Sequence, residues 1–176
     1  MSSASAAAKV VIVGPLKVGK STIANFLAEP TSTLGAPDKY KPTVGLRIRE
    51  FERDVAGGSG SGVLNVNLWD VSGDQKYEGC WPAIIKDAVG VIIVYNPDSK
   101  AHEKEAELWY EWFVSNAGLS DRQCLVFAHR PGNGPRVRPP RALSSCHAQV
   151  TSFESPGLIR MEFDKFLSTI ANLMEG

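Results

Sequence analysis

Four residues near the amino end of the chain stand in a spacing that suits phosphate chemistry. Gly14 and Gly19 are followed directly by Lys20 and Ser21, in the order G-x-x-x-x-G-K-[ST]. The glycines let the backbone turn so that successive amide groups point at phosphate oxygens. Lys20 adds positive charge beside the outer phosphates, and the Ser21 hydroxyl is an oxygen ligand for Mg²⁺ at the start of a helix. The predicted phosphate-binding residues are Gly14, Lys17, Val18, Gly19, Lys20, Ser21 and Thr22.

The residues on both sides of this loop have the strand and helix patterns that a phosphate loop requires. Residues 9–13 read K-V-V-I-V, a β-branched run typical of a buried parallel strand. Residues 21–28 carry apolar side chains at helical spacing, and Pro30 is expected to end that helix. A glycine loop that only turns the chain is the alternative, and the flanking pattern argues against it.

Further strand and helix signals alternate along the chain. Strands are predicted at residues 9–13, 44–49, 64–68, 90–95, 123–128 and, with a weaker pattern, 146–151. The glycines and serines of residues 57–62 indicate a flexible tip that joins the second and third strands as an antiparallel hairpin. One helix is predicted at residues 102–116, with an apolar face made of Leu108, Trp109, Trp112 and Phe113. A last helix is predicted to start at Pro156, after Ser155.

The segment before the last strand departs from this alternation. Residues 131–143 are rich in proline and arginine, so we expect a loop where a helix would otherwise lie. The predicted fold is therefore α/β, with a doubly wound, mostly parallel six-stranded sheet and one antiparallel edge strand. Its ligand is expected at the carboxyl ends of the strands.

Length and composition favour one domain and argue against some partners. With 176 residues, 43% of them hydrophobic, the chain can bury one sizeable core, and we assign residues 9–176 to it after a disordered tail at 1–8. The formal net charge is zero, so we expect no nucleic acid partner. Three widely spaced cysteines, with no signal sequence, indicate reduced thiols. Residues 173–176 contain no cysteine, so we also expect no prenyl anchor.

Two further motifs follow the phosphate loop. Residues 40–45 (Y-K-P-T-V-G) and 69–75 (W-D-V-S-G-D-Q) resemble the two switch regions of the Ras and Rab small GTPases. The resemblance implies that Thr43 reaches Mg²⁺ and the γ-phosphate, that Asp70 holds Mg²⁺ through water, and that the Gly73 amide contacts the γ-phosphate. GTP or GDP and Mg²⁺ are the implied ligands, with Ser21, Thr43 and Asp70 around the metal. A solvated acid at a strand end is the alternative for Asp70.

The chain differs from the Ras and Rab enzymes at the residue that supports GTP hydrolysis. The position after D-x-x-G, where the family has a glutamine that orients water, is Asp74, and a glutamine follows only at Gln75. An anionic side chain there adds repulsion where phosphoryl transfer needs charge relief. Asp74 and Gln75 are therefore the candidate catalytic residues, and we expect GTP hydrolysis to be weak or absent. The alternative is a one-residue shift that places Gln75 where it can orient the attacking water.

The segment that recognises the guanine base in Ras-like proteins also differs in this chain. In place of N-K-x-D, whose aspartate pairs with guanine, residues 128–132 read A-H-R-P-G. His129 or Arg130 could stack on a base, or both could be solvated loop residues. Ser152 is the nearest candidate for the second base-binding loop. The missing aspartate predicts a reduced preference for GTP over ATP.

Several short phrases are more specific than the switch motifs. Residues 78–83 (E-G-C-W-P-A), 107–110 (E-L-W-Y) and 159–163 (I-R-M-E-F) resemble the Rab-like small GTPase subunits of intraflagellar transport complex B. The resemblance implies work in the cilium or flagellum and the cytoplasm, docked on coiled-coil subunits of that complex. Tyr77 and Trp81 are candidate docking anchors, or Trp81 packs beneath the switch. An active GTPase switch using Gln75, and an interaction module that needs no nucleotide, are the alternative functions.

Overall fold

The computed structural model describes residues 7–29, 45–57, 60–132 and 134–176. The strands are β1 (Ala7–Val13), β2 (Leu46–Gly57), β3 (Gly60–Val71), β4 (Gly90–Tyr95), β5 (Cys124–His129) and β6 (His147–Thr151). The α-helices are α1 (Lys20–Ala28), α2 (Trp81–Ile85), α3 (Lys100–Tyr110) and α4 (Pro156–Glu175). Shorter helical turns are η1 (Gln75–Cys80), η2 (Glu111–Ser115), η3 (Asp121–Gln123) and η4 (Arg141–Leu143).

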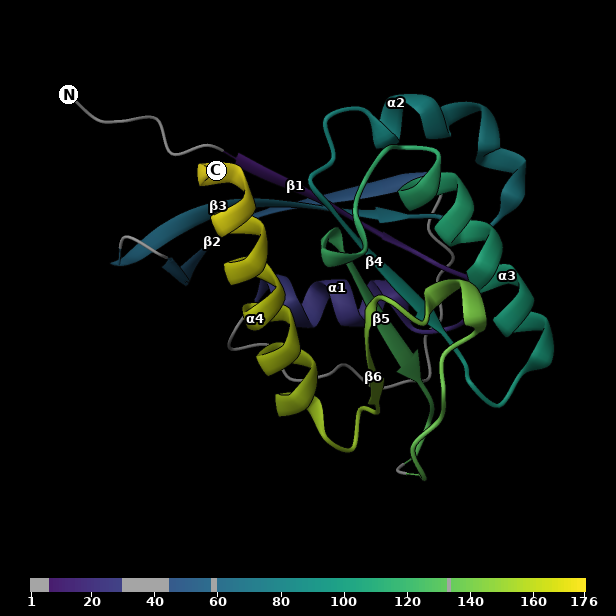
Figure 1. Cartoon of the computed structure of the whole chain (residues 1–176). Coiled ribbons are helices and arrows are strands. Elements are labelled where there is room, and N and C mark those ends of the chain that lie inside the picture. Colours follow the sequence, from purple (N-terminus) through teal and green to yellow (C-terminus); the bar gives the residue numbers. More distant parts are fainter. Residues whose placement is uncertain (1–6, 30–44, 58–59, 133) are drawn as a thin grey trace.

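The described strands form one six-stranded sheet in the order β2-β3-β1-β4-β5-β6. Only the β2–β3 pair is antiparallel among these strands, and the other neighbours run parallel. Helices α1 and α4 cover one face of the sheet, and α2 and α3 cover the other (Figure 1). The predicted fold class is confirmed. In the described part of the chain, no helix is both long and apolar enough to span a lipid bilayer.

The first strand carries the phosphate loop. Its last four residues, Val10 to Val13, are all fully buried, because β3 and β4 flank the strand and helices cover both faces. The strand begins at Ala7, two residues before the predicted start of the domain, and Ala8 is already buried. Pro30 and Thr43 lie outside the described residues.

The β2–β3 hairpin is much longer than its sequence pattern indicated. Pairing continues from Leu46–Val71 to Gly57–Gly60, so most of the glycine-rich stretch predicted as a loose tip is strand. Tertiary contacts explain the difference. Arg53 of β2 donates to the carbonyl oxygen of Leu27 in α1 and lies 3.7 Å from the Asp164 carboxylate of α4. The two helices thus hold β2 against the sheet beyond the part that its own side chains specify.

Aromatic side chains fill the space between α2 and α3. The ring centroid of Trp81 lies 4.8 Å from that of Trp109, 4.7 Å from that of Trp112 and 5.6 Å from that of Phe113. Trp81 is only 6% exposed. Of the two interpretations of Trp81, packing beneath the switch is therefore correct and the docking anchor is wrong.

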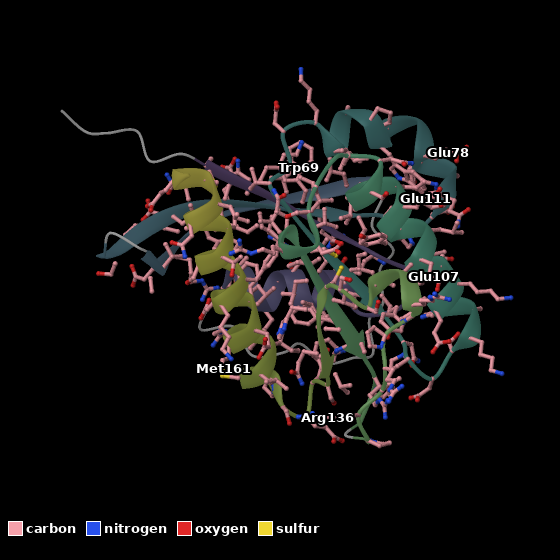
Figure 2. The ribbon with its side chains drawn as sticks, viewed as in Figure 1. Trp69, Glu78, Glu107, Glu111, Arg136 and Met161 are labelled. Carbon is pink, nitrogen blue, oxygen red and sulfur yellow. The ribbon has the colours of Figure 1, made fainter. Side chains whose placement is uncertain are left out.

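Helix α3 differs from its prediction in one residue and at its end. Leu108, expected on the apolar face, is 40% exposed, and Glu107 and Glu111 also lie on the outer side (Figure 2). The helix continues into a π-helical turn, η2, which adds one residue per turn and brings Phe113 and Val114 into the core. Gly118, with φ of +72°, closes the segment as predicted for a helix end.

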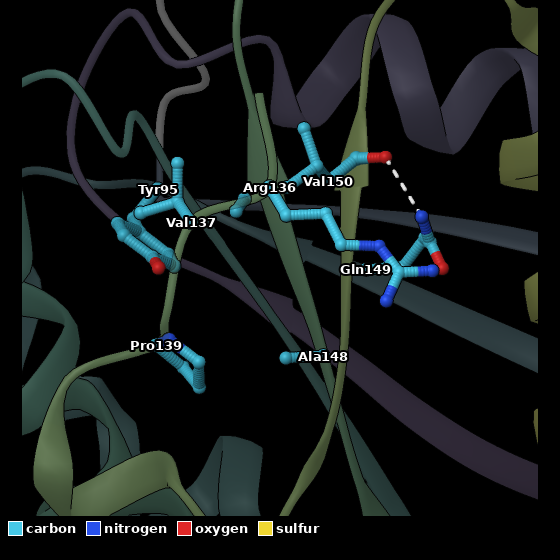
Figure 3. Close-up of a pocket in the computed structure, with 8 residues that line it drawn as sticks. Tyr95, Arg136, Val137, Pro139, Ala148, Gln149 and Val150 are labelled. Atoms are coloured by element: carbon cyan, nitrogen blue, oxygen red, sulfur yellow. Dashed lines mark hydrogen bonds between the residues drawn. The ribbon is translucent and has the colours of Figure 1, made fainter. Parts of the chain in front are cut away.

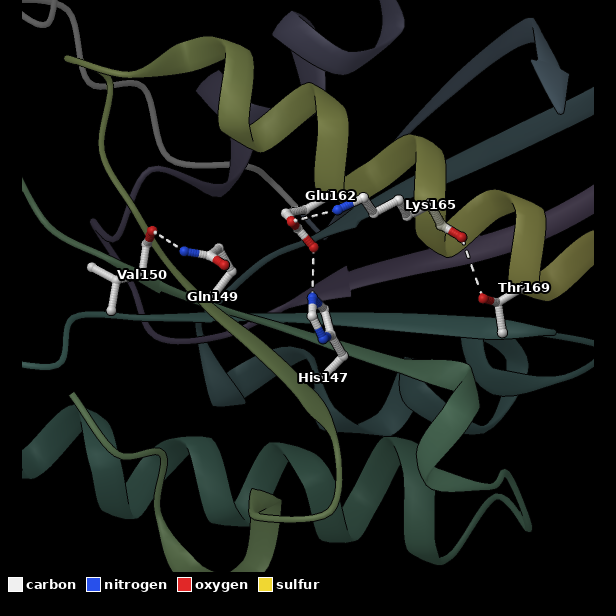
Figure 4. Close-up of polar contacts among 6 residues, drawn as sticks. All are labelled: His147, Gln149, Val150, Glu162, Lys165 and Thr169. Atoms are coloured by element: carbon white, nitrogen blue, oxygen red, sulfur yellow. Dashed lines mark hydrogen bonds and ion pairs between the residues drawn. The ribbon is translucent and has the colours of Figure 1, made fainter. Parts of the chain in front are cut away.

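The last third of the chain agrees with its prediction. Residues 131–132 and 134–140 have no regular secondary structure before the short turn η4, β6 follows, and α4 begins at Pro156. Glu162 lies on the buried side of α4, where its carboxylate is 2.5 Å from His147 Nε2 and 3.5 Å from Lys165 Nζ (Figure 4). This pairing satisfies a buried carboxylate and ties β6 to α4.

Replacing Trp81 with alanine tests its assignment to the core. We expect the substitution to lower the free energy of unfolding by about 3–5 kcal/mol, because it removes a buried aromatic side chain and leaves a cavity. Met161→Ala is the control, since Met161 is 47% exposed on α4, and should change the value by less than about 0.5 kcal/mol. Urea unfolding followed by circular dichroism gives both values. Equal, small losses of stability in the two variants would contradict the assignment of Trp81 to the core.

Candidate functional site

The loop between β1 and α1 has a backbone that only certain residues can follow. Gly14 has φ of +147°, and a Cβ atom there would lie 2.0 Å from the carbonyl oxygen of Val94. Gly19, with φ of +100°, is the N-cap of α1. Lys17 also has positive φ, +59°, which is strained for a residue with a side chain. The predicted phosphate-loop residues thus follow a tight turn that ends at the amino terminus of a helix.

Lys20, the first residue of α1, is buried beneath this turn. The side chain is 7% exposed, and its Nζ donates to the carbonyl oxygen of Pro15 at 2.5 Å. Burial lowers the pKa of Lys20 to about 8, while the charges of Asp70 and Glu105 oppose the shift. The ammonium group is therefore held at the loop and remains mostly protonated at neutral pH.

Ser21 and Asp70 meet beside the loop. The Ser21 hydroxyl donates to Asp70 Oδ2 at 2.5 Å, and Asp70, near the end of β3, is 2% exposed. A hydroxyl and a carboxylate from two different elements are suitable ligands for a hard cation such as Mg²⁺. Among the described residues, no group of three or more His, Cys, Asp and Glu side chains could hold a metal. A Mg²⁺ ion that takes its other oxygens from phosphate and water does not require such a group.

The segment after β3 packs directly on the phosphate loop. A Cβ atom on Gly73 would lie 2.7 Å from the backbone at each of Gly14, Pro15 and Leu16. Only glycine allows this approach, so the backbone of residue 73 packs directly on the backbone of the loop. The Ser72 amide also donates to the carbonyl oxygen of Gly45 at 2.9 Å, so the segments before β2 and after β3 are joined.

The two candidate catalytic residues begin η1. Asp74 is its N-cap: Oδ1 accepts from the Lys76 amide at 3.0 Å, and Oδ2 lies 3.5 Å from Lys76 Nζ. Gln75 is exposed. Asp74 therefore has a local structural role that its position in the motif did not reveal.

His129 lies where β5 reaches the phosphate loop. Its Nδ1 is 2.9 Å from Thr151 Oγ1, and its ring meets the edge of Phe153 at 4.4 Å between centroids. Both rings are 3.4–3.5 Å from the position of a Cβ on Gly19. Burial lowers the pKa of His129 to about 4, so the ring is neutral at physiological pH.

The other two predicted base-end residues are also buried. Ser152 connects the segments that follow β5 and β6. Its hydroxyl donates to the Pro131 carbonyl oxygen at 3.3 Å and accepts from the Glu154 amide at 3.2 Å. Arg130 points elsewhere: its guanidinium is 3.6 Å from the Asp98 carboxylate, beyond the end of β4. This contact gives no support to base stacking by Arg130.

Sequence reasoning did not single out Thr151, Phe153 and Glu154. They flank Ser152 at the end of β6, and an aromatic residue just after a strand end was the available signal. A separate cavity of about 190 Å³ lies between the proline-rich loop and β6 (Figure 3). Its lining includes Tyr95, Arg136 and Val150 and no phosphate-loop residue.

Comparison with known proteins agrees with this geometry. Residues 9–130 match the family described as Roc, the Ras-of-Complex domain of DAPkinase. The intraflagellar transport protein 22 homolog of Danio rerio is 41% identical over 174 residues, which cover 94% of this chain and 91% of that protein. The GTP-bound crystal structure of T. brucei IFT22/74/81 aligns with a TM-score of 0.75 and 32% identity, covering 94% of this chain and 95% of the matched chain. The GDP-bound T. brucei IFT22 structure aligns with a TM-score of 0.65 and 28% identity, covering 92% and 97%.

The low pKa of His129 predicts an acid-sensitive fold. The unfolded chain binds a proton at His129 below about pH 6.5, and the folded chain only below about pH 4. The stabilising contribution of neutral His129 is thus complete above pH 6.5 and decreases as pH falls towards 4, by about 3 kcal/mol at most. Urea unfolding of wild type and His129→Gln at pH 7 and 4.5 tests this. The variant should lose less stability on acidification, and identical losses would contradict the assignment.

Proposed function

The chain belongs to the intraflagellar transport protein 22 family, and we propose that it binds GTP and GDP with Mg²⁺ and serves assembly more than hydrolysis. In this proposal the chain is an atypical small GTPase, and its bound nucleotide orders the segments around the phosphate loop. The ordered surface then docks coiled-coil subunits of intraflagellar transport complex B in the cilium or flagellum and the cytoplasm.

The observation that carries this proposal is the meeting of Ser21 and Asp70 beside buried Lys20. The 2.5 Å contact brings a hydroxyl and a carboxylate together at the amino terminus of α1, where backbone amides and the helix dipole favour phosphate. Ser21 and Asp70 would hold Mg²⁺, with Thr43 as the remaining predicted ligand. The metal would neutralise charge on the outer phosphates.

The surroundings of Asp74 support weak hydrolysis. Its carboxylate is engaged by the amide and ammonium groups of Lys76, and the Gln75 side chain is exposed. A residue that orients attacking water must lie against the γ-phosphate. The contacts with Lys76 occupy the Asp74 carboxylate, which makes it poorly suited to orient a water nucleophile.

The hydrogen bond between Ser72 and Gly45 supports the role in assembly. It joins the segment that precedes β2 to the one that follows β3, so a γ-phosphate that orders Gly73 also affects the start of β2. The relative captured as GTP-bound IFT22/74/81 supports partners of this kind for the present chain. Tyr77, partly exposed on η1, remains a candidate anchor.

Replacing Ser21 with asparagine tests the metal and phosphate arrangement. We expect a larger loss of affinity for GTP than for GDP, because the metal bridges the outer phosphates. Calorimetric titration in Mg²⁺ gives both values, and Ser115→Asn, at an exposed position of η2, is the matched control. Equal losses for both nucleotides would argue against the arrangement, and a wild-type protein that binds neither would refute the proposed function.

The turnover rate tests the emphasis on assembly. The purified chain should hydrolyse GTP no faster than roughly 10⁻⁴ per second, the scale of an unassisted Ras-type enzyme. Asp74→Gln should raise the rate by restoring a water-orienting amide, and Gln75→Ala should leave it unchanged. Phosphate release under single-turnover conditions measures all three. A wild-type rate near one per second would make the chain an active enzyme, and an effect of Gln75→Ala alone would reverse the two roles.

A further inference from the structure

The sheet ends at β6 with a free edge. Among the described strands β6 pairs only with β5, and it lies between α4 and the proline-rich loop (Figure 1). The Thr151 carbonyl oxygen accepts from the Arg130 amide at 3.1 Å, so the backbone of Thr151 faces β5. Successive residues of a parallel strand direct their backbone groups to opposite sides. The N–H and C=O groups of Ala148 and Val150 therefore face away from β5.

The loop beside this edge does not pair with it. Within the described structure, residues 134–140 make no hydrogen bond to the backbone of β6. Three of these residues are prolines, which have no N–H group to donate. The Val150 carbonyl oxygen accepts instead from the side-chain amide of Gln149 at 3.2 Å (Figure 3). A main-chain donor of another strand can replace this amide, so the edge remains able to pair.

Two cavities flank the free edge. The cavity of about 190 Å³ and a second one of about 170 Å³ share Arg136, Gln149 and Val150 in their linings. The first includes Tyr95, on the face of the sheet that α3 covers, and the second includes Leu158 of α4. Each volume is several times the roughly 30 Å³ of a water molecule. Because the side chains of a strand point alternately to the two faces, a strand added to β6 would direct them in turn into the two cavities.

The two cavities differ in chemistry. The first has an apolar lining that includes Val137 and Pro139, whereas the second includes polar residues such as Thr151. Arg136 lines both cavities, and Figure 3 shows its side chain reaching towards Gln149. The Arg136 side chain is exposed and has no hydrogen bond or ion pair with the described residues. Its guanidinium group can therefore bind an anionic side chain of a partner.

The charge around the edge indicates the sign of that partner. Residues 131–153 contain three arginines and no aspartate or glutamate. On the α4 side the Glu162 carboxylate is already paired with His147 and Lys165. Glu154, which follows β6, is the first acidic residue after this stretch. The edge is therefore positively charged although the whole chain has no net charge, and an acidic segment is complementary to it.

We propose that the free edge of β6 binds an extended segment of a partner protein in which apolar and acidic residues alternate. Main-chain hydrogen bonds to Ala148 and Val150 hold the segment, its apolar side chains enter the cavity beside Tyr95, and its acidic side chains meet Arg136. Neither cavity is lined by a phosphate-loop residue. The inference therefore goes beyond the proposed function and adds a second interaction surface.

Magnetic resonance of the ¹⁵N-labelled full chain tests the proposal with three eight-residue peptides. One alternates valine with glutamate, and one alternates valine with lysine. The third is the glutamate peptide with all its amides N-methylated, which keeps the side chains but donates no main-chain hydrogen bond. The glutamate peptide should bind and slow the hydrogen exchange of the Ala148 and Val150 amides. The other two peptides should bind at least roughly tenfold more weakly, because each lacks one of the two required interactions.

Two variants separate the charge from the backbone contacts. Arg136→Glu should weaken binding of the glutamate peptide by roughly tenfold and strengthen binding of the lysine peptide. Arg122→Glu, the same change at an exposed position of η3, is the matched control and should alter neither affinity. Val150→Pro removes an outward N–H group and keeps the pairing with β5, as proline does on edge strands. It should weaken the glutamate peptide by roughly threefold to tenfold.

Several outcomes would overturn the inference. If the N-methylated peptide binds as well as the glutamate peptide, strand addition is wrong. If Arg136→Glu and Arg122→Glu have equal effects, the acidic partner is wrong. If none of the peptides changes exchange at Ala148 and Val150, the edge is not a docking site for such a segment. Protection of these amides without peptide, in a chain that sediments as a dimer, would assign the edge to a second copy instead.

Discussion

The close approach of backbones around Gly14 is the constraint on which the rest of the site depends. On one side the carbonyl oxygen of Val94 leaves no space for a side chain at Gly14, and on the other Gly73 lies against the same turn. This packing sets β1, β4 and the segment after β3 in one arrangement, since any larger residue would separate them. Ser21 and Asp70 can meet at 2.5 Å only because their two elements converge here. The chemistry of the site is thus a consequence of missing side chains as much as of those present.

The ends of β5 and β6 around His129 are packed by side chains, in contrast to the backbone packing around Gly14. Around Gly14 the chain packs backbone against backbone, whereas around His129 it fills space with rings and internal hydrogen bonds. Burying an imidazole without charge lowers its pKa and costs little when Thr151 satisfies Nδ1. The wall formed by His129 and Phe153 therefore carries no charge at neutral pH.

Local patterns sufficed to predict the phosphate loop, the parallel strands and the proline-rich loop, because glycine spacing, β-branched runs and proline act within a few residues. They failed where distant contacts decide. The extension of β2 depends on Arg53 reaching α1 and α4, and the burial of Trp81 depends on rings contributed by α3. The capping contact between Asp74 and Lys76 was also not predicted, because it depends on where η1 begins. The proximity of Glu154 to Gly132 could not be predicted either, because the two residues follow different strands.

Capping by Asp74 gives a structural reason for an aspartate at this position. An N-cap aspartate stabilises its helix by about 1 kcal/mol, and here that helix directly follows the glycine that contacts the phosphate loop. Glutamine at the same position would orient water but is a poorer cap, so a chain selected for a well-ordered η1 gains from the aspartate. In the function proposed above, a nucleotide that stays bound would keep Gly73 and, through the hydrogen bond from Ser72 to Gly45, the start of β2 in one arrangement. An assembly subunit needs these segments to stay ordered for longer than its encounter with a partner. A GTPase switch, in contrast, needs the ordered state to end when the nucleotide is hydrolysed.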